Sequence, residues 1–385
     1  MIRIDEIYNN TFWPWLQKNK PGTRLFFCDP PGSTKPDSLF NLGSNDIVEN
    51  DYVWMHDQEP CWIDEYALLF DEVKIRNRDI GWHYINETEW VQNFKNPNGH
   101  IVVSEKGEYV ERLCEKYGWK SHYYFYHGWA CMDWFRGYDK SFLIPRAEDR
   151  TPAKTFMSPN RIVGGKRDHR VLFLYNVFTQ QLEHNHISAP RICQYENVDI
   201  SQVANKYCNI YPDISQVFEQ ATLPRLFAGE ESQQMTSCWL TNFFEAQDSL
   251  VYVPTETVYF GQRTHITEKT FKAIALEMPF VLVAAAGSLE YMRSYGFKTF
   301  DGIFDESYDL ENDDILRIEK VTRLLKELDI LSPKERQAIH RACLPIVEHN
   351  YRHFYQGGFT DVLWTELTGM LNDIAEYFVA TSQTD

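Results

Sequence analysis

A short segment in the second half of the chain combines side chains that suit an anionic, hydroxyl-bearing ligand. Thr267, Glu268 and Lys269 stand at the expected start of a helix, where free backbone N–H groups attract anions. The ammonium of Lys269 suits a diphosphate, and the carboxylate of Glu268 can accept hydrogen bonds from paired hydroxyls such as those of ribose. Glu256 adds a second acid at the end of the preceding strand. The pattern predicts a nucleotide-sugar site, although Thr-Glu-Lys at a helix start is also an ordinary cap.

A second candidate for phosphate binding is the basic segment 158–170. Its cations fall within ten residues: Arg161, Lys166, Arg167 and Arg170. The planar guanidinium of arginine matches phosphate oxygens, so Arg161 and Arg170 are the predicted ligands. Arg161 is favoured because Asn160 beside it can order the turn. A solvated loop of ordinary charge is the alternative interpretation.

The first half of the chain offers candidates for a general base. If an acceptor hydroxyl attacks a sugar carbon, a carboxylate or an imidazole must take its proton. Asp57 and Glu59 follow an expected strand at 52–55, and His127 follows another at 122–126. A polar turn, or a packed histidine, would explain the same residues without chemistry. Metal binding is a rival interpretation, because Asp57-x-Glu59 is similar to the Asp-x-Asp motif of metal-dependent transferases. No true Asp-x-Asp occurs in the chain, so we expect no metal, and we expect no other cofactor.

Apolar, β-rich runs alternate with helical patterns along the chain, which predicts an α/β fold built on parallel sheets. Strands are expected at 24–28, 52–55, 100–104, 122–126, 169–175, 249–253 and 279–284, and helices at 105–119 and 267–277. The segment 145–159 has three prolines and no periodicity, so it is predicted to be a linker. The tail, about 313–379, is expected to be helical, with Pro333 near the start of one helix.

These elements predict two similar α/β lobes with an interlobe cleft and a helical C-terminal tail. The expected division is an acceptor-side lobe over 1–150, a donor-binding lobe over 151–350, and a C-terminal helix over 351–385 that packs back on the first lobe. Ligands of such lobes bind at the carboxyl ends of the strands, which places the expected site in the cleft.

The segment ITEKTFKAIALEMPFVLV resembles the donor-binding signature of fucosyltransferase-like and exostosin-like glycosyltransferases. The segment GSLEYMRSYGFKTFDGIFDESYD is similar to bacteriophage-encoded proteins of this type. The resemblance implies a GT-B fold of two Rossmann-like lobes and an inverting glycosyltransferase whose co-substrate is a nucleotide-sugar. The absence of an Asp-x-Asp motif favours a metal-independent reaction. It assigns the donor ribose to Glu268, the phosphate to Lys269, and the charge of the leaving diphosphate to an arginine of 161–170.

The resemblance to phage proteins makes a 5-hydroxymethylated pyrimidine in DNA a candidate acceptor. A surface saccharide or a protein is the alternative acceptor, and a non-catalytic phage protein with a transferase-like fold is the rival from another class. The net charge of −17 disfavours generic binding to nucleic acid. A DNA acceptor would therefore need a locally basic cleft.

The remaining features of composition predict a soluble protein of the cytoplasm, or of the host cytoplasm if the chain is phage-encoded. The start of the chain lacks a secretory pattern, and the longest apolar run is too short to span a membrane. The eight cysteines have no CxxC spacing, so they are expected to be reduced core thiols.

Overall fold

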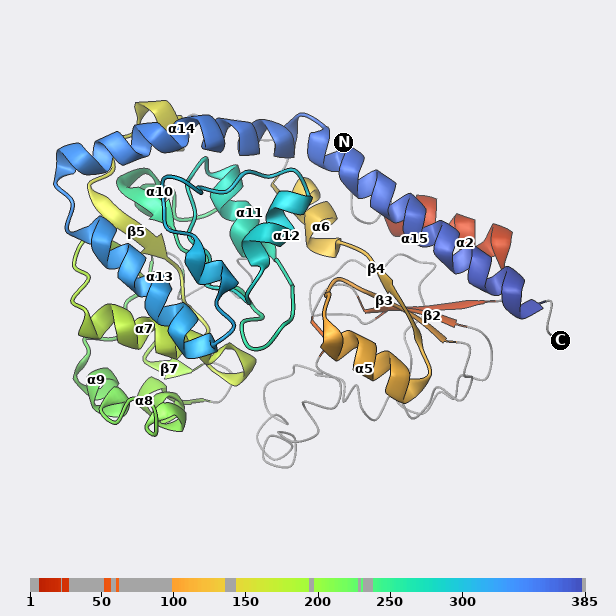
Figure 1. The fold of residues 1–385 in the computed structure, drawn as a ribbon, viewed down its shortest axis with the longest axis horizontal. Coiled ribbons are helices and arrows are strands. Elements are labelled where there is room, and N and C mark those ends of the chain that lie inside the picture. Colours follow the sequence, from red (N-terminus) through yellow and green to blue (C-terminus); the bar gives the residue numbers. More distant parts are fainter. Residues whose placement is uncertain are drawn as a thin grey trace. The chain divides into compact units, whose positions relative to one another are not determined.

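A computed structural model of the chain is shown in Figure 1. It describes residues 7–21, 23–27, 52–56, 60–61, 99–135, 143–193, 197–227, 230 and 238–382. Contacts between these residues divide the chain into two compact units, the first comprising Met1–Asp133 with Asp361–Asp385 and the second Trp134–Thr360. Each unit contains a parallel sheet, and the C-terminal region is helical, so the predicted α/β class with parallel sheets is confirmed.

The first unit is built on a parallel sheet of four strands, paired in chain order. These strands are β1 (Arg24–Phe27), β2 (Tyr52–His56), β3 (Gly99–Val103) and β4 (Lys120–Tyr123). Helix α5 (Glu108–Tyr117) connects β3 to β4 and ends at Gly118, whose left-handed backbone (φ 72°) glycine adopts readily. The predicted strand–helix–strand unit is therefore confirmed.

The last strand of this sheet ends earlier than predicted. β4 stops at Tyr123, and Tyr126 already begins helix α6 (Tyr126–Trp134). The aromatic run 123–126 suits a strand as well as a buried helix start, so composition could not place the boundary. His127 consequently lies on a helix rather than directly after a strand.

Aromatic side chains form much of the core beneath this sheet. The indole N–H of Trp119 donates to the hydroxyl of Tyr52 at 2.8 Å, and the rings of Trp119 and Trp54 pack edge to face with centroids 5.5 Å apart. Such pairs add to the free energy of burial because ring edges and faces carry opposite partial charges. The core residues of α5 face the same cluster: Val110, Leu113 and Cys114.

Three further helices complete the described part of the first unit: the π-helical turn η1 (Ile7–Phe12), α2 (Trp13–Asn19) and most of α15 (Gly358–Ser382). Helix α15 packs against the start of α6 and the residue before it. The carboxylate of Glu366 accepts the backbone N–H of Phe125 at 3.2 Å, and the rings of Trp364 and Trp129 lie 4.7 Å apart. The end of the chain thus contributes to the same unit as its beginning.

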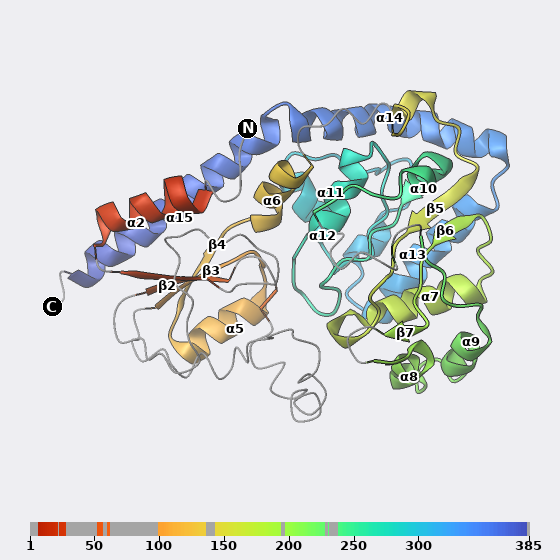
Figure 2. The same ribbon diagram turned by 180° about the vertical axis from the view of Figure 1, so that it is seen from behind.

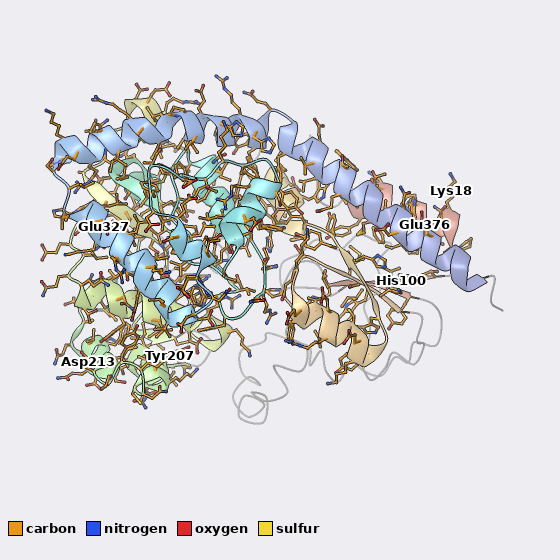
Figure 3. All side chains as sticks on the ribbon, viewed as in Figure 1. Lys18, His100, Tyr207, Asp213, Glu327 and Glu376 are labelled. Atoms are coloured by element: carbon orange, nitrogen blue, oxygen red, sulfur yellow. The ribbon has the colours of Figure 1, made fainter. Side chains whose placement is uncertain are left out.

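A buried histidine, His100, and a half-buried one, His122, join β3 to β4 in this unit. Nδ1 of His100 lies 2.8 Å from Nε2 of His122, while the ring centroids are 5.0 Å apart and the planes nearly parallel at 15°. The rings therefore meet edge to edge, and the two facing nitrogens share one hydrogen. Figure 3 labels His100 among the side chains of the first unit.

We expect this histidine pair to make the fold sensitive to acid. Burial lowers the pKa of His100 to about 3, with help from His122, Lys120 and Lys20, and lowers the pKa of His122 to about 4 against the opposing effect of Asp373. The unfolded chain then binds more protons below pH ~6.5, so stability present at neutral pH is lost as the pH falls. As the pH falls from 7.5 to 5.5, we expect the pair to lower the free energy of unfolding by about 2 to 3 kcal/mol.

Urea unfolding at the two pH values checks this expectation. Replacing both His100 and His122 by glutamine should remove most of the pH dependence. The matched control His349→Gln, at a partly exposed histidine, should leave it unchanged. An equal fall of stability in wild type and the double variant would contradict the assignment.

The second unit contains a parallel sheet whose first strand lies in the middle. The strand order is β6 (Asn185–Ile187), β5 (Lys154–Ser158) and β9 (Ser249–Tyr252). Figure 2 shows β5 beside β6. The segment after Pro279, predicted as a strand, runs parallel to β9 and makes two bridges, from Phe280 to Tyr252 and from Val283 to Thr255. The chain leaves β5 toward one edge and returns on the other side of it.

The start of this unit differs from the sequence prediction in two respects. Residues 169–175, predicted as a strand, begin helix α7 (His169–Thr179). All residues of this helix from 169 to 177 are buried, so it lacks the one-sided apolar pattern by which a helix is recognised. The first strand is instead β5, which lies inside the predicted linker 145–159.

The remainder of the predicted linker is also ordered by specific contacts. It contains the 3-10 turn η3 (Ala147–Asp149), and the guanidinium of Arg150 donates to the backbone oxygens of Pro145, Leu276 and Glu277. Long-range contacts of one arginine thus fix a segment without periodicity.

The other elements of the second unit surround this sheet. The short elements are η4 (Gly165–Arg167), β7 (Ile192–Cys193), β8 (Val198–Asp199), α8 (Ile200–Ala204), η5 (Asn205–Tyr207), α9 (Ile214–Gln220), α10 (Phe243–Asp248), α12 (Ser288–Ser294) and η6 (Ser307–Leu310). The longer helices are α11 (Glu268–Ala275), α13 (Asp314–Asp329) and α14 (Pro333–Tyr355). The predicted helix at 267–277 and the helical tail are confirmed.

Helix α14 shows why the tail could be read from sequence. Pro333 occupies its first turn, and Ser332 with Glu335 forms a capping box. Cys61, Cys114, Cys131, Cys193 and Cys343 are buried, as predicted, whereas Cys208 is exposed and Cys238 is partly exposed, so the prediction of core thiols is wrong at these two positions. Among the described helices, none combines the length and apolar character needed to cross a bilayer.

Candidate functional site

The candidate site lies at the carboxyl ends of β5 and β9 in the second unit. In open parallel sheets, ligands bind where the strand order reverses, because the connections from neighbouring strands leave in opposite directions there. β5 and β9 are such a pair, since the chain passes from β5 to β6 on one side and reaches β9 on the other. The segments 159–168 and 253–267 leave these two strand ends and lead toward α7 and α11.

The carboxylate of Glu256 fixes the start of α11. One oxygen accepts the backbone N–H of Thr267 at 3.2 Å and the hydroxyl of Thr270 at 2.6 Å. The other oxygen accepts the hydroxyl of Thr267 at 2.5 Å. Glu256 is fully buried, at 0% exposure. We therefore interpret this predicted donor ligand as a positioning residue, because its oxygens are used inside the protein.

Lys269 lies in a polar cluster at the same helix start. Its Nζ donates to the hydroxyl of Thr257 at 3.1 Å, to the hydroxyl of Thr267 at 3.0 Å and to Oε1 of Glu268 at 3.1 Å. The side chains of Lys269 and Glu268 retain 23% and 11% of their exposure. The structure thus brings together Thr267, Glu268 and Lys269 with their charged groups partly accessible, and it adds Thr257, which the sequence analysis did not assign.

The first two residues of α7 hold the segment that carries Thr257. The guanidinium of Arg170 donates to the backbone oxygens of Ile162 and Thr255, both at 2.7 Å, and the side chain is buried. Nε2 of His169 donates to the backbone oxygen of Glu256 at 3.1 Å. The predicted phosphate ligand Arg170 therefore clamps two loops, and its terminal nitrogens point to backbone carbonyls.

His169 belongs to a stack that stiffens the same loop. Its ring lies parallel to that of Tyr259, with centroids 4.9 Å apart, and the guanidinium carbon of Arg317 lies 4.3 Å from the Tyr259 ring centroid. Burial holds the pKa of His169 well below its usual range, so the imidazole is neutral. A neutral ring can keep its hydrogen bond to Glu256 over the whole working pH range.

A buried network of hydrogen bonds joins the carboxyl ends of β5 and β9. The amide of Asn160 donates to the backbone oxygen and the hydroxyl of Ser158, and its oxygen accepts the hydroxyl of Thr255 at 2.9 Å. The expectation that Asn160 orders its turn is confirmed. The hydroxyl of Ser188 links Asn160 to the carboxylate of Glu230. Sequence reasoning missed this connection, because nothing along the chain joins residues 30 to 70 positions apart.

The basic side chains next to this network lie on the segment between β5 and α7. Arg161, Lys166 and Arg167 are partly exposed. Burial raises the pKa of Glu230, and the positive charge of Arg161 opposes this shift. Arg161 follows the end of β5 by three residues, and it keeps an accessible surface.

The first unit places polar side chains at the carboxyl ends of its own strands. The backbone N–H of Cys61 donates to the carboxylate of Glu105 at 3.0 Å, and Sγ of Cys61 lies 3.8 Å from Nδ1 of His56. Glu105 is 2% exposed, and it is the one acid among the described residues of this unit that is buried. Sequence reasoning missed Glu105 because it was assigned only to the following helix.

Of the predicted base candidates, the structure describes only His127. It lies in the first turn of α6 with 7% exposure, and its ring contacts that of Tyr126. Asp57 and Glu59 lie outside the described residues. Within the described ranges, no group of three or more histidine, cysteine, aspartate or glutamate side chains is arranged to hold a metal ion.

The clamp made by Arg170 predicts a specific effect of a conservative change. In Arg170→Lys a single ammonium cannot span both carbonyl oxygens, so we expect a loss of stability of about 1 to 2 kcal/mol. Amide hydrogen exchange near residues 162 and 255–257 should accelerate. The control Arg167→Lys, at a partly exposed site, should change stability by less than about 0.5 kcal/mol. Unchanged exchange in Arg170→Lys would show that the clamp does not order these loops.

Comparisons with known proteins give little similarity. No protein-family model matches the chain, and no curated protein matches it. A solved structure with some likeness is that of a DNA-modifying β-glucosyltransferase, determined with and without its substrate uridine diphosphoglucose. The match covers 83% of this chain and 74% of that chain, at 10% sequence identity and a TM-score of 0.38. At this level of similarity the two chains are not shown to share a fold.

Proposed function

We propose that the chain is a glycosyltransferase that moves a sugar from a nucleotide-sugar to an acceptor hydroxyl. The proposal rests on one observation, the cluster of Lys269, Glu268 and two threonine hydroxyls beside the carboxyl end of β9. This cluster offers an ammonium for a diphosphate and a carboxylate for ribose hydroxyls. Both groups are held by neighbours that are themselves fixed, as a binding site requires.

The proposed reaction is a direct displacement with inversion. The acceptor oxygen forms a bond to the anomeric carbon while the bond from that carbon to the diphosphate oxygen breaks. The diphosphate leaves with the electron pair, and Lys269 and Arg161 stabilise its charge. The acceptor proton passes to a base, for which Asp57, Glu59 and His127 are the candidates.

We propose a 5-hydroxymethylated pyrimidine in DNA as the acceptor, with a surface saccharide or a protein as the alternative. The net charge of −17 opposes polyanion binding over the surface as a whole. The partly exposed cations between β5 and α7 could offset this charge locally.

The test is transfer by the purified chain. It is incubated with hydroxymethylated duplex DNA and several nucleotide-sugars, and the nucleosides are then analysed by mass spectrometry. A gain of one sugar unit minus water supports the DNA acceptor. Transfer only to saccharides or proteins supports the alternative acceptor, and absence of transfer to all three with every donor contradicts the proposed activity.

A further inference from the structure

A histidine, an aspartate and a phenylalanine of the second unit form a group that the proposed reaction does not use. Nε2 of His186, on β6, lies 2.8 Å from Oδ2 of Asp248, at the end of α10. The ring centroid of Phe244 lies 5.8 Å from that of His186, with the planes at 66°. Phe244 and Asp248 are four residues apart, so one face of α10 brings both to His186. Asp248 directly precedes β9, whereas Lys269 and its partners lie beyond the opposite end of that strand.

The carboxylate of Asp248 determines which ring nitrogen of His186 is open to a ligand. Nε2 carries the hydrogen that Asp248 accepts, so in the neutral imidazole Nδ1 carries a lone pair. Among the residues that the structure describes, Nδ1 of His186 has no hydrogen-bond partner. The side chains of His186 and Asp248 keep 19% and 24% of their exposure. The pair therefore presents an oriented hydrogen-bond acceptor on an accessible surface.

The ring of Phe244 adds an apolar surface next to this acceptor. Its side chain is 63% exposed, although it belongs to a helix that packs against β5 and β9. The face of an aromatic ring carries partial negative charge and attracts the weakly positive C–H bonds of a ligand. A ligand that uses both groups must combine a hydrogen-bond donor with a face of C–H bonds. A sugar ring has this combination, because its hydroxyls project from the edge of a C–H surface.

The charge of the surrounding chain favours a neutral ligand. No lysine or arginine occurs between Arg225 and Arg263, and α10 carries the carboxylates of Glu245 and Asp248. A nucleic acid, whose bases could also stack on Phe244, is repelled by these carboxylates and by the net charge of −17. A neutral saccharide meets no such repulsion.

We infer that His186 and Phe244 form a binding site for a neutral saccharide. A sugar hydroxyl donates to Nδ1 of His186, and the C–H face of the same sugar lies on the ring of Phe244. Asp248 is a positioning residue, because it acts by fixing the tautomer and the orientation of the imidazole. The site does not depend on the proposed transfer, since no step of that reaction uses these three residues.

Calorimetric titration of the full chain with neutral hexasaccharides of glucose, mannose and galactose tests this inference. At least one of them should bind saturably at concentrations up to about 10 mM. His186→Ala and Phe244→Ala should each weaken this binding about 3- to 10-fold, the range of one hydrogen bond or one aromatic contact. Asp248→Ala should weaken it as well. In ¹⁵N spectra of labelled histidine, Asp248→Ala should also replace the single Nε2–H tautomer of His186 by a mixture.

Two matched controls should bind the saccharide as wild type does. His184→Ala removes a half-exposed histidine two residues away that also faces an aspartate, Asp329, and Ile330→Ala removes an apolar side chain of 72% exposure. Failure of all three hexasaccharides to bind overturns the inference, as do equal losses in the controls or unchanged binding in His186→Ala and Phe244→Ala. A single-stranded DNA hexamer is the rival probe, and its binding in place of the saccharides, lost in the same two variants, also overturns it.

Discussion

Replacing Lys269 by alanine is expected to weaken the binding of the donor nucleoside diphosphate about 10- to 100-fold. The variant loses a hydrogen bond from an ammonium to phosphate, and bonds to charged groups contribute about 1.5–3 kcal/mol. The rate of sugar transfer should fall by at least the same factor, to a level that abolishes measurable transfer. The reason is that the charge of the leaving diphosphate grows as the reaction proceeds. Glu268→Ala is expected to abolish transfer as well.

The fold should tolerate the change at Lys269. The side chain keeps 23% exposure, and the helix start is capped by Thr267 and Glu256 without it. Lys334→Ala, which removes an exposed first-turn lysine of α14, is the matched control and should bind the nucleotide as wild type does. Wild-type affinity or wild-type turnover in Lys269→Ala would remove the central role of this lysine.

Replacing Glu256 by alanine is expected to lower the free energy of unfolding by about 3 kcal/mol. The change leaves one backbone N–H and two threonine hydroxyls at the start of α11 without their acceptor, in a site that water does not reach. Each buried donor that loses its partner costs about 1–3 kcal/mol, and relaxation of the hydroxyls recovers part of the total.

Chemical denaturation of Glu256→Ala and Glu256→Gln measures this effect. Glutamine keeps one acceptor oxygen of the same reach, so its loss should be about half as large. Glu290→Ala, at an exposed first turn, should stay within about 0.5 kcal/mol of wild type. A Glu256→Ala variant as stable as wild type would mean that this carboxylate does not support α11.

Local signals in the sequence were sufficient for much of the fold. Gly118 marked the end of α5, Thr267 marked the start of α11, and Pro333 marked the start of α14. Each of these residues acts through its own backbone or through a cap within a few positions, so its effect can be read along the chain.

The errors have a different physical origin. Helix α7 is buried on all sides, so its apolar run could not be told from a strand. Strand β5 lies within a proline-containing stretch. Arg150 of this stretch donates hydrogen bonds to the backbone oxygens of Leu276 and Glu277, which are far away in the sequence. In both cases the tertiary environment, and not the local pattern, decided the structure.

Part of the candidate site could be predicted because its residues are neighbours in the sequence. Thr267, Glu268 and Lys269 adjoin in sequence, and they adjoin in space because they share one helix turn. The positions of Thr257 and Glu105 depend on which strands are neighbours in the sheets. The sequence alone does not show how the strands pair. Glu256 holds the start of α11 and Arg170 holds the segment after β9. Both roles follow from hydrogen-bond partners that the sequence does not predict.

A crystal structure with a bound nucleoside diphosphate would test the central claim most directly. We predict a phosphate oxygen within hydrogen-bonding distance of Nζ of Lys269, and a ribose hydroxyl donating to the carboxylate of Glu268. A nucleotide bound elsewhere, without contact to Lys269 or Glu268, would contradict the assignment of this site.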